Sequence, residues 1–429
     1  MVHSPLTQPS ASDRQPAHEP PRTETQAPAR ASAAIPEAGL LAPALPATAS
    51  AETFNLEPAI LAPAILEPAI LEAAVLEIDL GAVVANWRLL GRNHPSGPVA
   101  GVVKADAYGL GAAQVAPALH EAGCRHFFVA LPQEALAIRA SIPGAMLAVL
   151  GGLPRGAEPD YVAHRLTPVL NSLAELDAWT ATARRLGRAL PASLQIDTGM
   201  ARLGLDRHEL AALQADHGRL AGIDLRYVMT HLVASEAPAD PTNHLQRARF
   251  DAACAGLPPA PRSFANSSGI FLGAGWGSDL ARPGAALYGI NPTPGRPNPM
   301  RLPVRLTARI LAVRDLRPGE TVGYNATWRA ARPSRIATVG VGYADGWHRS
   351  LSGCGRALFD GTPVPLVGRV SMDLTTFDVT DHPEAQPGST LELLGPAQTP
   401  DDVARDAGTN GYEVLTSLGR RFHRIYRPA

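Results

Sequence analysis

The residue with the most distinctive chemistry in this sequence is its only lysine. Of the 38 basic residues among 429, 37 are arginines and one is Lys104. A drift from lysine to arginine wherever only a positive charge is needed would explain the ratio. An amine, however, can lose its proton and bond covalently to a carbonyl carbon, whereas a guanidinium stays charged. The count alone does not distinguish a catalytic lysine from one that was retained by chance.

The sequence around Lys104 favours the catalytic amine. Apolar residues precede it in VVKADAYGLG, residues 102–111, and a loop flanked by glycines follows. An amine at the end of a buried strand is desolvated, which lowers its pKa toward the range in which it is nucleophilic. We therefore expect a carbonyl-bearing cofactor or substrate as its partner, rather than a carboxylate in a surface salt bridge.

The elements that would position this lysine alternate between short apolar runs and amphipathic stretches over residues 76–303. This alternation predicts an α/β fold with a parallel (β/α)₈ TIM-type barrel, which typically takes ~250 residues. A doubly wound sheet is the alternative, but no G-x-G-x-x-G turn follows the first strand. The predicted strands are Val99–Lys104, His126–Ala130, Met146–Gly151, Leu166–Asn171, Ser193–Asp197, Leu225–Thr230, Ser263–Asn266 and Gly284–Leu287. The predicted helices include Gln114–Ala122, Gln133–Ala140, Leu173–Leu186 and Glu209–Asp216.

The regions on either side of this segment have a different texture. Residues 1–75 are rich in proline and alanine, with Phe54 as their only aromatic residue, and are predicted to be a disordered tail. Residues 304–429 contain alternating runs and tight turns such as Asp360-Gly361. They predict a mostly antiparallel β domain, with one helix near Pro400–Ala407.

Composition excludes several classes of function. The net charge is −1, so no nucleic-acid partner is implied. No apolar run approaches the ~20 residues that span a bilayer, so no membrane partner is expected. Cys124, Cys254 and Cys354 are too widely spaced for a disulfide framework or a metal site, and no H-E-x-x-H pair occurs. The cysteine pattern favours a reducing compartment, and we expect a cytoplasmic protein without a metal.

Residues with useful chemistry follow the predicted strands, at the end where barrels place their catalytic groups. Together they offer one amine, two arginines, one histidine and a small-residue set suited to phosphate. They are Lys104, Asn171, residues 197–202, His231, residues 266–267 and residues 282–284.

These segments resemble the alanine racemase family. VVKADAYGLG is similar to the family's pyridoxal-phosphate lysine motif, and the resemblance covers residues 76–429. It implies a barrel with a C-terminal β domain, and a pyridoxal 5'-phosphate enzyme that interconverts L- and D-alanine. Such an enzyme supplies D-alanine for cell-wall peptidoglycan or degrades it. The other matching segments follow in the family's order: DTGMARLG at 197–204, TH at 230–231, ANS at 265–267, RPGAALYG at 282–289, VGY at 322–324, GYADGW at 342–347 and GRVSMD at 368–373.

The resemblance implies two catalytic residues and a set that binds phosphate. Lys104 would hold the cofactor covalently and serve as one base. Tyr324 would be the second acid–base group, on the opposite face of the cofactor. The phosphate would lie among Tyr108, Ser267, Gly284, Ala285 and Tyr412.

The resemblance also assigns residues to the cofactor ring and the substrate. Arg282, supported by His231, would face the pyridine nitrogen. Arg202 would donate to the phenolic oxygen and help to bind the substrate carboxylate. In this family the residues matching Tyr324, Met372 and Asp373 act on the other subunit's cofactor, which implies a head-to-tail homodimer with shared active sites. The substrate pocket would be lined by Tyr343, Met372 and Asp373.

One position departs from the family pattern. Two residues before Asp197, many relatives carry a lysine that becomes carbamylated and orients the arginine, and here the residue is Gln195. Its amide could accept a hydrogen bond from Arg202 but brings no negative charge. A carbamylated lysine therefore cannot orient Arg202 in this chain.

Several other functions are alternatives to alanine racemisation. A serine or broad-specificity racemase is the nearest, because sequence does not fix pocket volume. A related decarboxylase would need a C-terminal cysteine catalyst, and Cys354 lies in an unsuitable Ser-Gly-Cys-Gly context. A non-catalytic barrel that carries pyridoxal phosphate would lack a counterpart of Tyr324. A class I aldolase would not need the Ser267 and Gly284 set.

Overall fold

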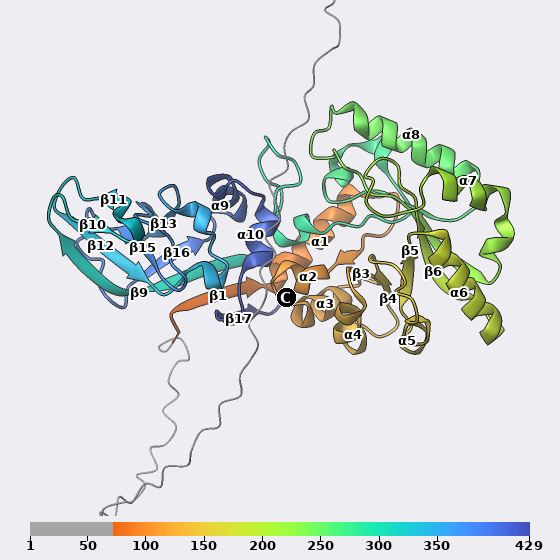
Figure 1. Ribbon diagram of the computed structural model, residues 1–429, viewed down its shortest axis with the longest axis horizontal. Coiled ribbons are helices and arrows are strands. Elements are labelled where there is room, and N and C mark those ends of the chain that lie inside the picture. The colour runs from red at the N-terminus through yellow and green to blue at the C-terminus, as the bar shows by residue number, and fades with distance from the viewer. Residues whose placement is uncertain (1–71) are drawn as a thin grey trace, which may run out of the picture. The chain divides into compact units, whose positions relative to one another are not determined.

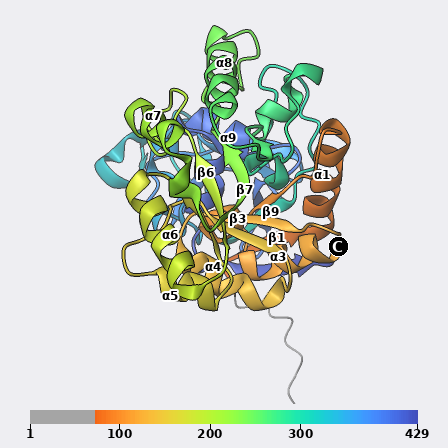
Figure 2. The same cartoon turned by 90° about the vertical axis from the view of Figure 1, so that its right-hand side faces the viewer.

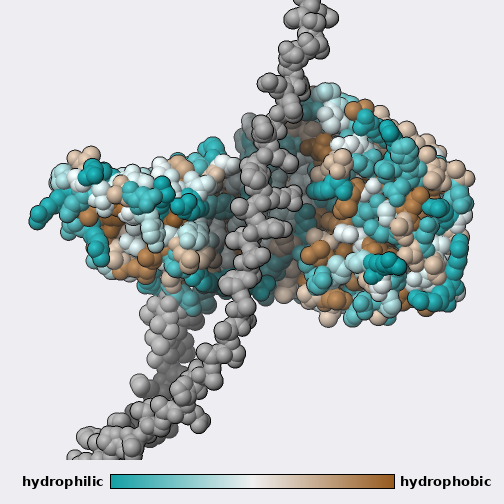
Figure 3. Space-filling view, in the orientation of Figure 1, coloured by the Kyte–Doolittle hydropathy of each residue, from teal (hydrophilic) through white to brown (hydrophobic). Residues whose placement is uncertain are grey.

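The structure is a computed structural model that describes residues 72–429 (Figure 1). The predicted disordered tail, residues 1–75, lies outside the described residues as far as residue 71. In the described part of the chain no helix is both long enough and apolar enough to cross a membrane. Figure 3 shows hydrophilic side chains over much of the visible surface, with apolar ones scattered between them.

A parallel sheet forms the first half of the fold and confirms the predicted barrel class. It has seven strands in chain order from β2 to β8, and Figure 2 shows helices covering its outer side. Most strands are short and buried, as expected for parallel strands covered by helices. The strands are β2 (Gly101–Val102), β3 (His126–Val129), β4 (Met146–Val149), β5 (Thr167–Leu170), β6 (Leu190–Gln195), β7 (Ile223–Met229) and β8 (Arg262–Ser263). The helices are α1 (Leu80–Asn93), α2 (Lys104–Tyr108), α3 (Ala112–Glu121), α4 (Pro132–Ile138), α5 (Glu158–Ala163), α6 (Leu173–Leu186), α7 (Arg207–Ala215) and α8 (Pro241–Ala255).

The predicted eighth strand at Gly284–Leu287 is wrong. Residues Ala285–Tyr288 form a single 3₁₀ turn, η6, which ends at Gly289 with a φ of 84°. A short apolar run does not distinguish a strand from a buried helical turn, which explains the error. The ring is instead completed by an isolated parallel bridge between Val99 and Ala281. The amide of Ala100 donates to the carbonyl of Ala281 at 2.9 Å.

The second sheet is mostly antiparallel, as predicted, and also includes a strand that precedes the barrel. Strand β1 pairs antiparallel with β9 and parallel with β17. The long strand β9 also pairs with β12 and β16, which places it at the centre of this sheet. The strands are β1 (Ala74–Asp79), β9 (Val304–Leu316), β12 (Ser334–Val339), β13 (Arg356–Phe359), β14 (Thr362–Pro365), β15 (Thr375–Asp378), β16 (Thr390–Leu394) and β17 (His423–Arg427), with a separate pair β10 (Thr321–Val322) and β11 (Trp328–Arg329).

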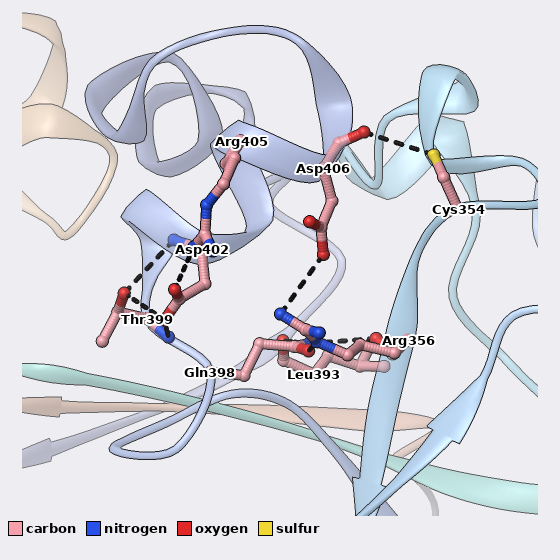
Figure 4. Close-up of polar contacts among 8 residues, drawn as sticks. All are labelled: Cys354, Arg356, Leu393, Gln398, Thr399, Asp402, Arg405 and Asp406. Atoms are coloured by element: carbon pink, nitrogen blue, oxygen red, sulfur yellow. Dashed lines mark hydrogen bonds and ion pairs between the residues drawn. The ribbon is translucent and has the colours of Figure 1, made fainter.

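Two helices follow the second sheet. Helix α9 spans Pro400–Ala407, as predicted, and begins at a capping box in which Thr399 accepts from the amide of Asp402. Figure 4 shows that an ion pair between Arg356 of β13 and Asp406, at 3.5 Å, ties this helix to the sheet. Helix α10 (Gly411–Ser417) was not predicted; its first residue is a glycine, which favours turns over helix interiors.

The interior of the barrel is a packed layer of side chains rather than a channel. Its members are fully or almost fully buried, and most of them point inward from successive strands. This layer separates the two ends of the barrel, and therefore anything that binds at one end from anything at the other. It consists of Ala100, Val102, Phe128, Ala148, Val169, Met229 and Leu280.

Candidate active site

Lys104 lies at the carboxyl end of β2, where a barrel places its catalytic groups. The amide of Val103 donates to the carbonyl of Phe128 at 2.9 Å, so the backbone is held in the sheet up to the residue before the lysine. Burial lowers the pKa of Lys104, and the charge of Arg202 lowers it further, while Glu134 partly offsets the shift. The amine is therefore easier to deprotonate than an exposed lysine, which is what a base or nucleophile requires.

The four residues after Lys104 form a left-handed turn. The φ values from Ala105 to Tyr108 lie between 52° and 55°. Left-handed backbone costs roughly 1–2 kcal/mol per residue outside glycine, so neighbouring groups must hold the turn in place. Glu134 accepts from the amide of Ala105 at 2.6 Å, and Asp106 accepts from the amide of Ala112 at 2.7 Å. This turn carries Tyr108 back toward the barrel end.

Ser267, Gly284 and Tyr108 converge on one place at this end. The hydroxyl oxygen of Ser267 accepts from the amides of Gly284 at 3.2 Å and Ala286 at 3.1 Å. A Cβ on Gly284 would lie 2.1 Å from the phenol oxygen of Tyr108, so only glycine fits there. The Tyr108 ring stacks on Tyr288 with centroids 4.8 Å apart, and burial raises its pKa. The neutral phenol of Tyr108 and the hydroxyl of Ser267 offer donors for an anion such as phosphate.

Arg282 is a buried cation with neutral hydrogen-bond partners. It is only 6% exposed, donates to the carbonyl of Thr230 at 2.6 Å and also bonds to Ser263. Among residues 72–429 no carboxylate forms an ion pair with it. Burial lowers the pKa of Arg282 to about 10, so the guanidinium stays charged near neutral pH. It would bind an electron-rich acceptor such as a ring nitrogen without giving up its proton.

His231 stays neutral beside this cation. Burial, and then the charges of Arg282, Arg202 and Lys104, lower the pKa of His231 to about 3. The same interactions place these four side chains within electrostatic reach of one another. The structure therefore gathers the predicted amine, both predicted arginines and the predicted histidine at one end of the barrel.

The loop that carries Arg202 holds this guanidinium without an ion pair to any carboxylate of residues 72–429. Asp197 accepts from the amides of Gly199 and Met200 at 2.8 and 2.9 Å, which closes the loop. The side-chain amide of Gln195 points to the carbonyl of Leu203, at 3.5 Å, rather than to Arg202. Its side-chain oxygen forms no hydrogen bond with Arg202 among residues 72–429, so the bond that Gln195 could accept from Arg202 is absent there. Gln195 instead holds the backbone one residue after the arginine.

The remaining predicted residues lie outside this cluster. Tyr324, the predicted second base, is 67% exposed, and within the described residues no hydrogen bond or ring contact joins it to the Lys104 group. Tyr343 and Met372 are exposed on neighbouring loops, joined by a bond from the amide of Tyr343 to the carbonyl of Ser371 at 3.0 Å. Tyr412 lies on α10, which packs against the end of the turn after Lys104, since a Cβ on Gly109 would lie 2.3 Å from the carbonyl oxygen of Leu415.

Three residues near the site were missed by the sequence reasoning. Glu134 supports the turn after Lys104, and Tyr288 packs on Tyr108. Arg421 donates to Asp373 at 2.8 Å and to the buried Asp345 at 2.6 Å, and so fixes the predicted substrate-pocket loop. Tyr288 could have been found, because it lies in the quoted segment at 282–289. Glu134 and Arg421 are far from their partners in the sequence and carry no comparable signal.

Family models, relatives and a solved structure that are similar to this chain all come from one protein family. The family description "Alanine racemase, N-terminal domain" matches residues 78–292, and "Alanine racemase, C-terminal domain" matches residues 303–426. An alanine racemase of Acidiphilium cryptum is 58% identical over 350 residues, which cover 82% of this chain and 98% of that protein. A catabolic alanine racemase of Mesorhizobium japonicum is 50% identical over 356 residues, covering 81% and 92%. The crystal structure of alanine racemase from Bartonella henselae with covalently bound pyridoxal phosphate superposes with a TM-score of 0.81 at 42% identity, covering 83% of this chain and 99% of that one.

Proposed function

This chain belongs to the alanine racemase family, and from that premise we propose that it is a pyridoxal-phosphate-dependent isomerase that interconverts L- and D-alanine. The observation that supports it most directly is the position of Lys104. The only lysine of the chain follows a buried strand, has a lowered pKa and lies in the electrostatic reach of Arg202 and His231. These are the conditions under which an amine can bond to a carbonyl.

The residues present fit pyridoxal phosphate. Lys104 would hold its aldehyde carbon, and Ser267 with the backbone of Gly284 and Ala285 would hold its phosphate. The missing Cβ of Gly284 lets the phenol of Tyr108 lie against this backbone, because a methyl group there would meet it. Arg282, buried and without a carboxylate partner in residues 72–429, would take the ring nitrogen.

The chain's own residues would move two protons. Bound pyridoxal phosphate supplies an electron sink that makes the α-hydrogen of an amino acid acidic. The amine of Lys104 would take or return this proton on one face of the substrate, and the phenol of Tyr324 would do so on the other. Racemisation needs a proton donor on each face, so either residue alone would only exchange the hydrogen without inverting the centre.

Arg282 would also favour racemisation over competing reactions. Its guanidinium keeps its proton, because even after burial its pKa is about 10. By donating a hydrogen bond without releasing its proton, Arg282 would keep the bound cofactor a weaker electron sink. Negative charge would then stay at Cα, where Lys104 or Tyr324 can reprotonate it promptly. A neutral His231 near Arg282 would add no competing positive charge.

The proposal includes a homodimer with shared active sites. Tyr324, Tyr343 and Met372 are exposed at 67%, 43% and 54% on a single chain, which is unusual for residues expected to line a pocket. A second copy would bring its own Tyr324 to the Lys104 of the first. A cytoplasmic location fits the three cysteines, which are free in the structure.

An absorbance spectrum with a reduction experiment tests the proposal. Purified protein supplied with pyridoxal phosphate should show a visible band that borohydride abolishes, with the reduced cofactor found by mass spectrometry on Lys104. The same preparation should convert L-alanine to D-alanine, followed by chiral chromatography. A Lys104→Arg variant, which keeps the charge, should do neither. A protein that binds no cofactor, or one whose label is absent from Lys104, would contradict the proposal.

A further inference from the structure

A cavity lies at the opposite end of the barrel from Lys104. Its volume is about 880 Å³, within the range of small-molecule sites. It is lined by residues at or near the amino ends of several strands, including His126 of β3, Met146 of β4, Thr167 of β5 and Asp224 of β7. The packed layer inside the barrel separates it from the candidate active site.

The charged groups of this cavity are mostly positive. Arg139, Arg165 and Arg226 line it, and Asp224 is the only carboxylate among its lining residues. Asp224 forms an ion pair with Arg226 at 2.7 Å, which neutralises one of the three guanidinium groups. The two histidines, His126 and His164, add no negative charge. Arg139 and Arg165 are therefore left without an acidic partner in the cavity.

The contacts of these two arginines leave donors available. Arg139 bonds to the carbonyls of Ala145, at 3.0 Å, and Ile142, so its position is fixed by the backbone rather than by a carboxylate. Arg165 is exposed, and no ion pair in residues 72–429 includes it. The two lie near enough that the charge of Arg165, after burial, lowers the pKa of Arg139. An oxyanion between them would relieve this repulsion and accept hydrogen bonds from both.

The rest of the lining suits an organic group rather than a bare ion. Pro143, Met146 and Leu225 supply apolar surface. The Tyr227 ring is fixed by a hydrogen bond between its hydroxyl and His126 at 3.1 Å and by an edge contact with that histidine. A fixed aromatic ring beside apolar side chains is a common surface for a flat or cyclic ligand.

We propose that this cavity binds a phosphate monoester of a small organic molecule, with Arg139 and Arg165 on the phosphate and Tyr227 beside the organic part. Guanidinium groups match phosphate oxygens through paired N–H donors, and a dianion would balance the two charges that lack an acidic partner. Binding there leaves the Lys104 end of the barrel free, so the ligand and the amino-acid substrate can be bound together.

Calorimetric titration of the cofactor-loaded enzyme tests this site. Adenosine monophosphate is the probe, adenosine tests the need for phosphate, and inorganic phosphate tests the need for an organic part. Free pyridoxal phosphate is removed beforehand, because it is itself a phosphate monoester. We expect the monophosphate to bind with saturation, phosphate to compete more weakly, and adenosine to give no saturable heat. Absence of binding by the monophosphate, or equal binding of adenosine, would overturn the proposal.

Variants of Arg165 test whether the probe binds in the cavity. Arg165→Gln should weaken binding of the monophosphate by about tenfold, the usual loss for one charge-assisted hydrogen bond, and Arg165→Glu should remove it. Arg185→Gln, a control on the exposed surface of α6, should stay within about twofold of the parent. All three should keep the parent's circular dichroism and racemase rate without probe. Undiminished binding in Arg165→Glu would show that the probe binds elsewhere.

Discussion

The chemically active side chains are buried at the barrel end and exposed in the second domain. At the barrel end Arg282 and Tyr108 are enclosed, and their hydrogen bonds and stacking fix their positions. In the second domain Tyr324 and Met372 project into solvent, 67% and 54% exposed. The side chains at the barrel end are held in positions that suit cofactor binding. The exposed side chains of Tyr324 and Met372 are not held by comparable contacts within the described chain.

Under the proposed homodimer, the two halves of one catalytic site would come from different subunits. A cofactor site must be preorganised before the cofactor arrives, so its groups are fixed by the fold. A group that is to act on a neighbouring subunit must instead be exposed until that subunit binds. Disrupting each half separately should therefore give different defects.

The largest expected effect comes from mixing two inactive variants. Lys104→Ala removes the group proposed to hold the cofactor, and Tyr324→Phe removes the proposed second base. A mixed dimer would contain one site with both defects and one with neither, so activity should return to about half per mixed dimer. Native mass spectrometry measures subunit exchange, and coupled assays measure racemisation. Exchanged subunits without activity would place both residues in the same chain's site.

Tyr324→Phe alone should slow racemisation by about 10²–10⁴-fold, the usual loss for a general base. Lys104 would still remove and return a proton on its own face. By family resemblance that face belongs to D-alanine, so the variant should exchange the α-hydrogen of D-alanine with deuterated water faster than it forms L-alanine. Nuclear magnetic resonance follows both processes in one sample. Equal slowing of exchange for both enantiomers would argue against a two-base arrangement.

On the barrel side, Gly284→Ala should weaken cofactor binding and leave the second domain intact. The added Cβ would lie 2.1 Å from the phenol oxygen of Tyr108 and displace it. Losing one hydrogen bond to a charged phosphate should cost about 2 kcal/mol, or roughly thirtyfold in affinity. Fluorescence titration with pyridoxal phosphate measures it. Gly91→Ala, in α1 with open space around it, is the matched control and should bind normally.

The neutral His231 predicts a dependence of stability on pH. Its folded pKa is about 3, below the ordinary value, so between pH 3 and about 6.5 the unfolded chain binds a proton that the folded chain does not. Stability should therefore fall as the pH drops through this window, by about 2 kcal/mol from this group between pH 7 and 5. Urea unfolding of the apoprotein at fixed concentration should show a shallower decline in His231→Asn. The exposed substitution His208→Asn should keep the parent's slope.

The smallest effect should come from the second-domain loop. Arg421→Met removes the bonds from this guanidinium to Asp345 and Asp373, and should loosen the loop that carries Met372. We expect a KM for alanine raised by about tenfold, with the cofactor absorbance unchanged. Arg349→Met, an exposed residue on the same domain, is the control. A lost cofactor band in Arg421→Met would show that the loop also supports the barrel end.

The sequence was most informative where one local signal determines structure. Helix α6 spans the predicted residues Leu173–Leu186, and the structure shows Ser172 capping its start with Glu175 three residues later. The left-handed turn after Lys104 could not be predicted, since alanines at 105 and 107 give no sign of positive φ. Glu134 could not be predicted either, because its carboxylate reaches that turn only through tertiary packing. The roles of the site residues stay predictions until the variants are measured.

The parallel pairing of β1 with β17 has a consequence for how the chain is made. Val75 pairs with His423 and Asp79 with Arg427, so the sheet joins one of the first described segments to one of the last. During synthesis β1 leaves the ribosome before the barrel, and its partners β9 and β17 come after it. The barrel segment is therefore synthesised while β1 still has two open edges, which favours aggregation of nascent chains. For the same reason, a fragment that stops after the barrel would carry an unpaired strand.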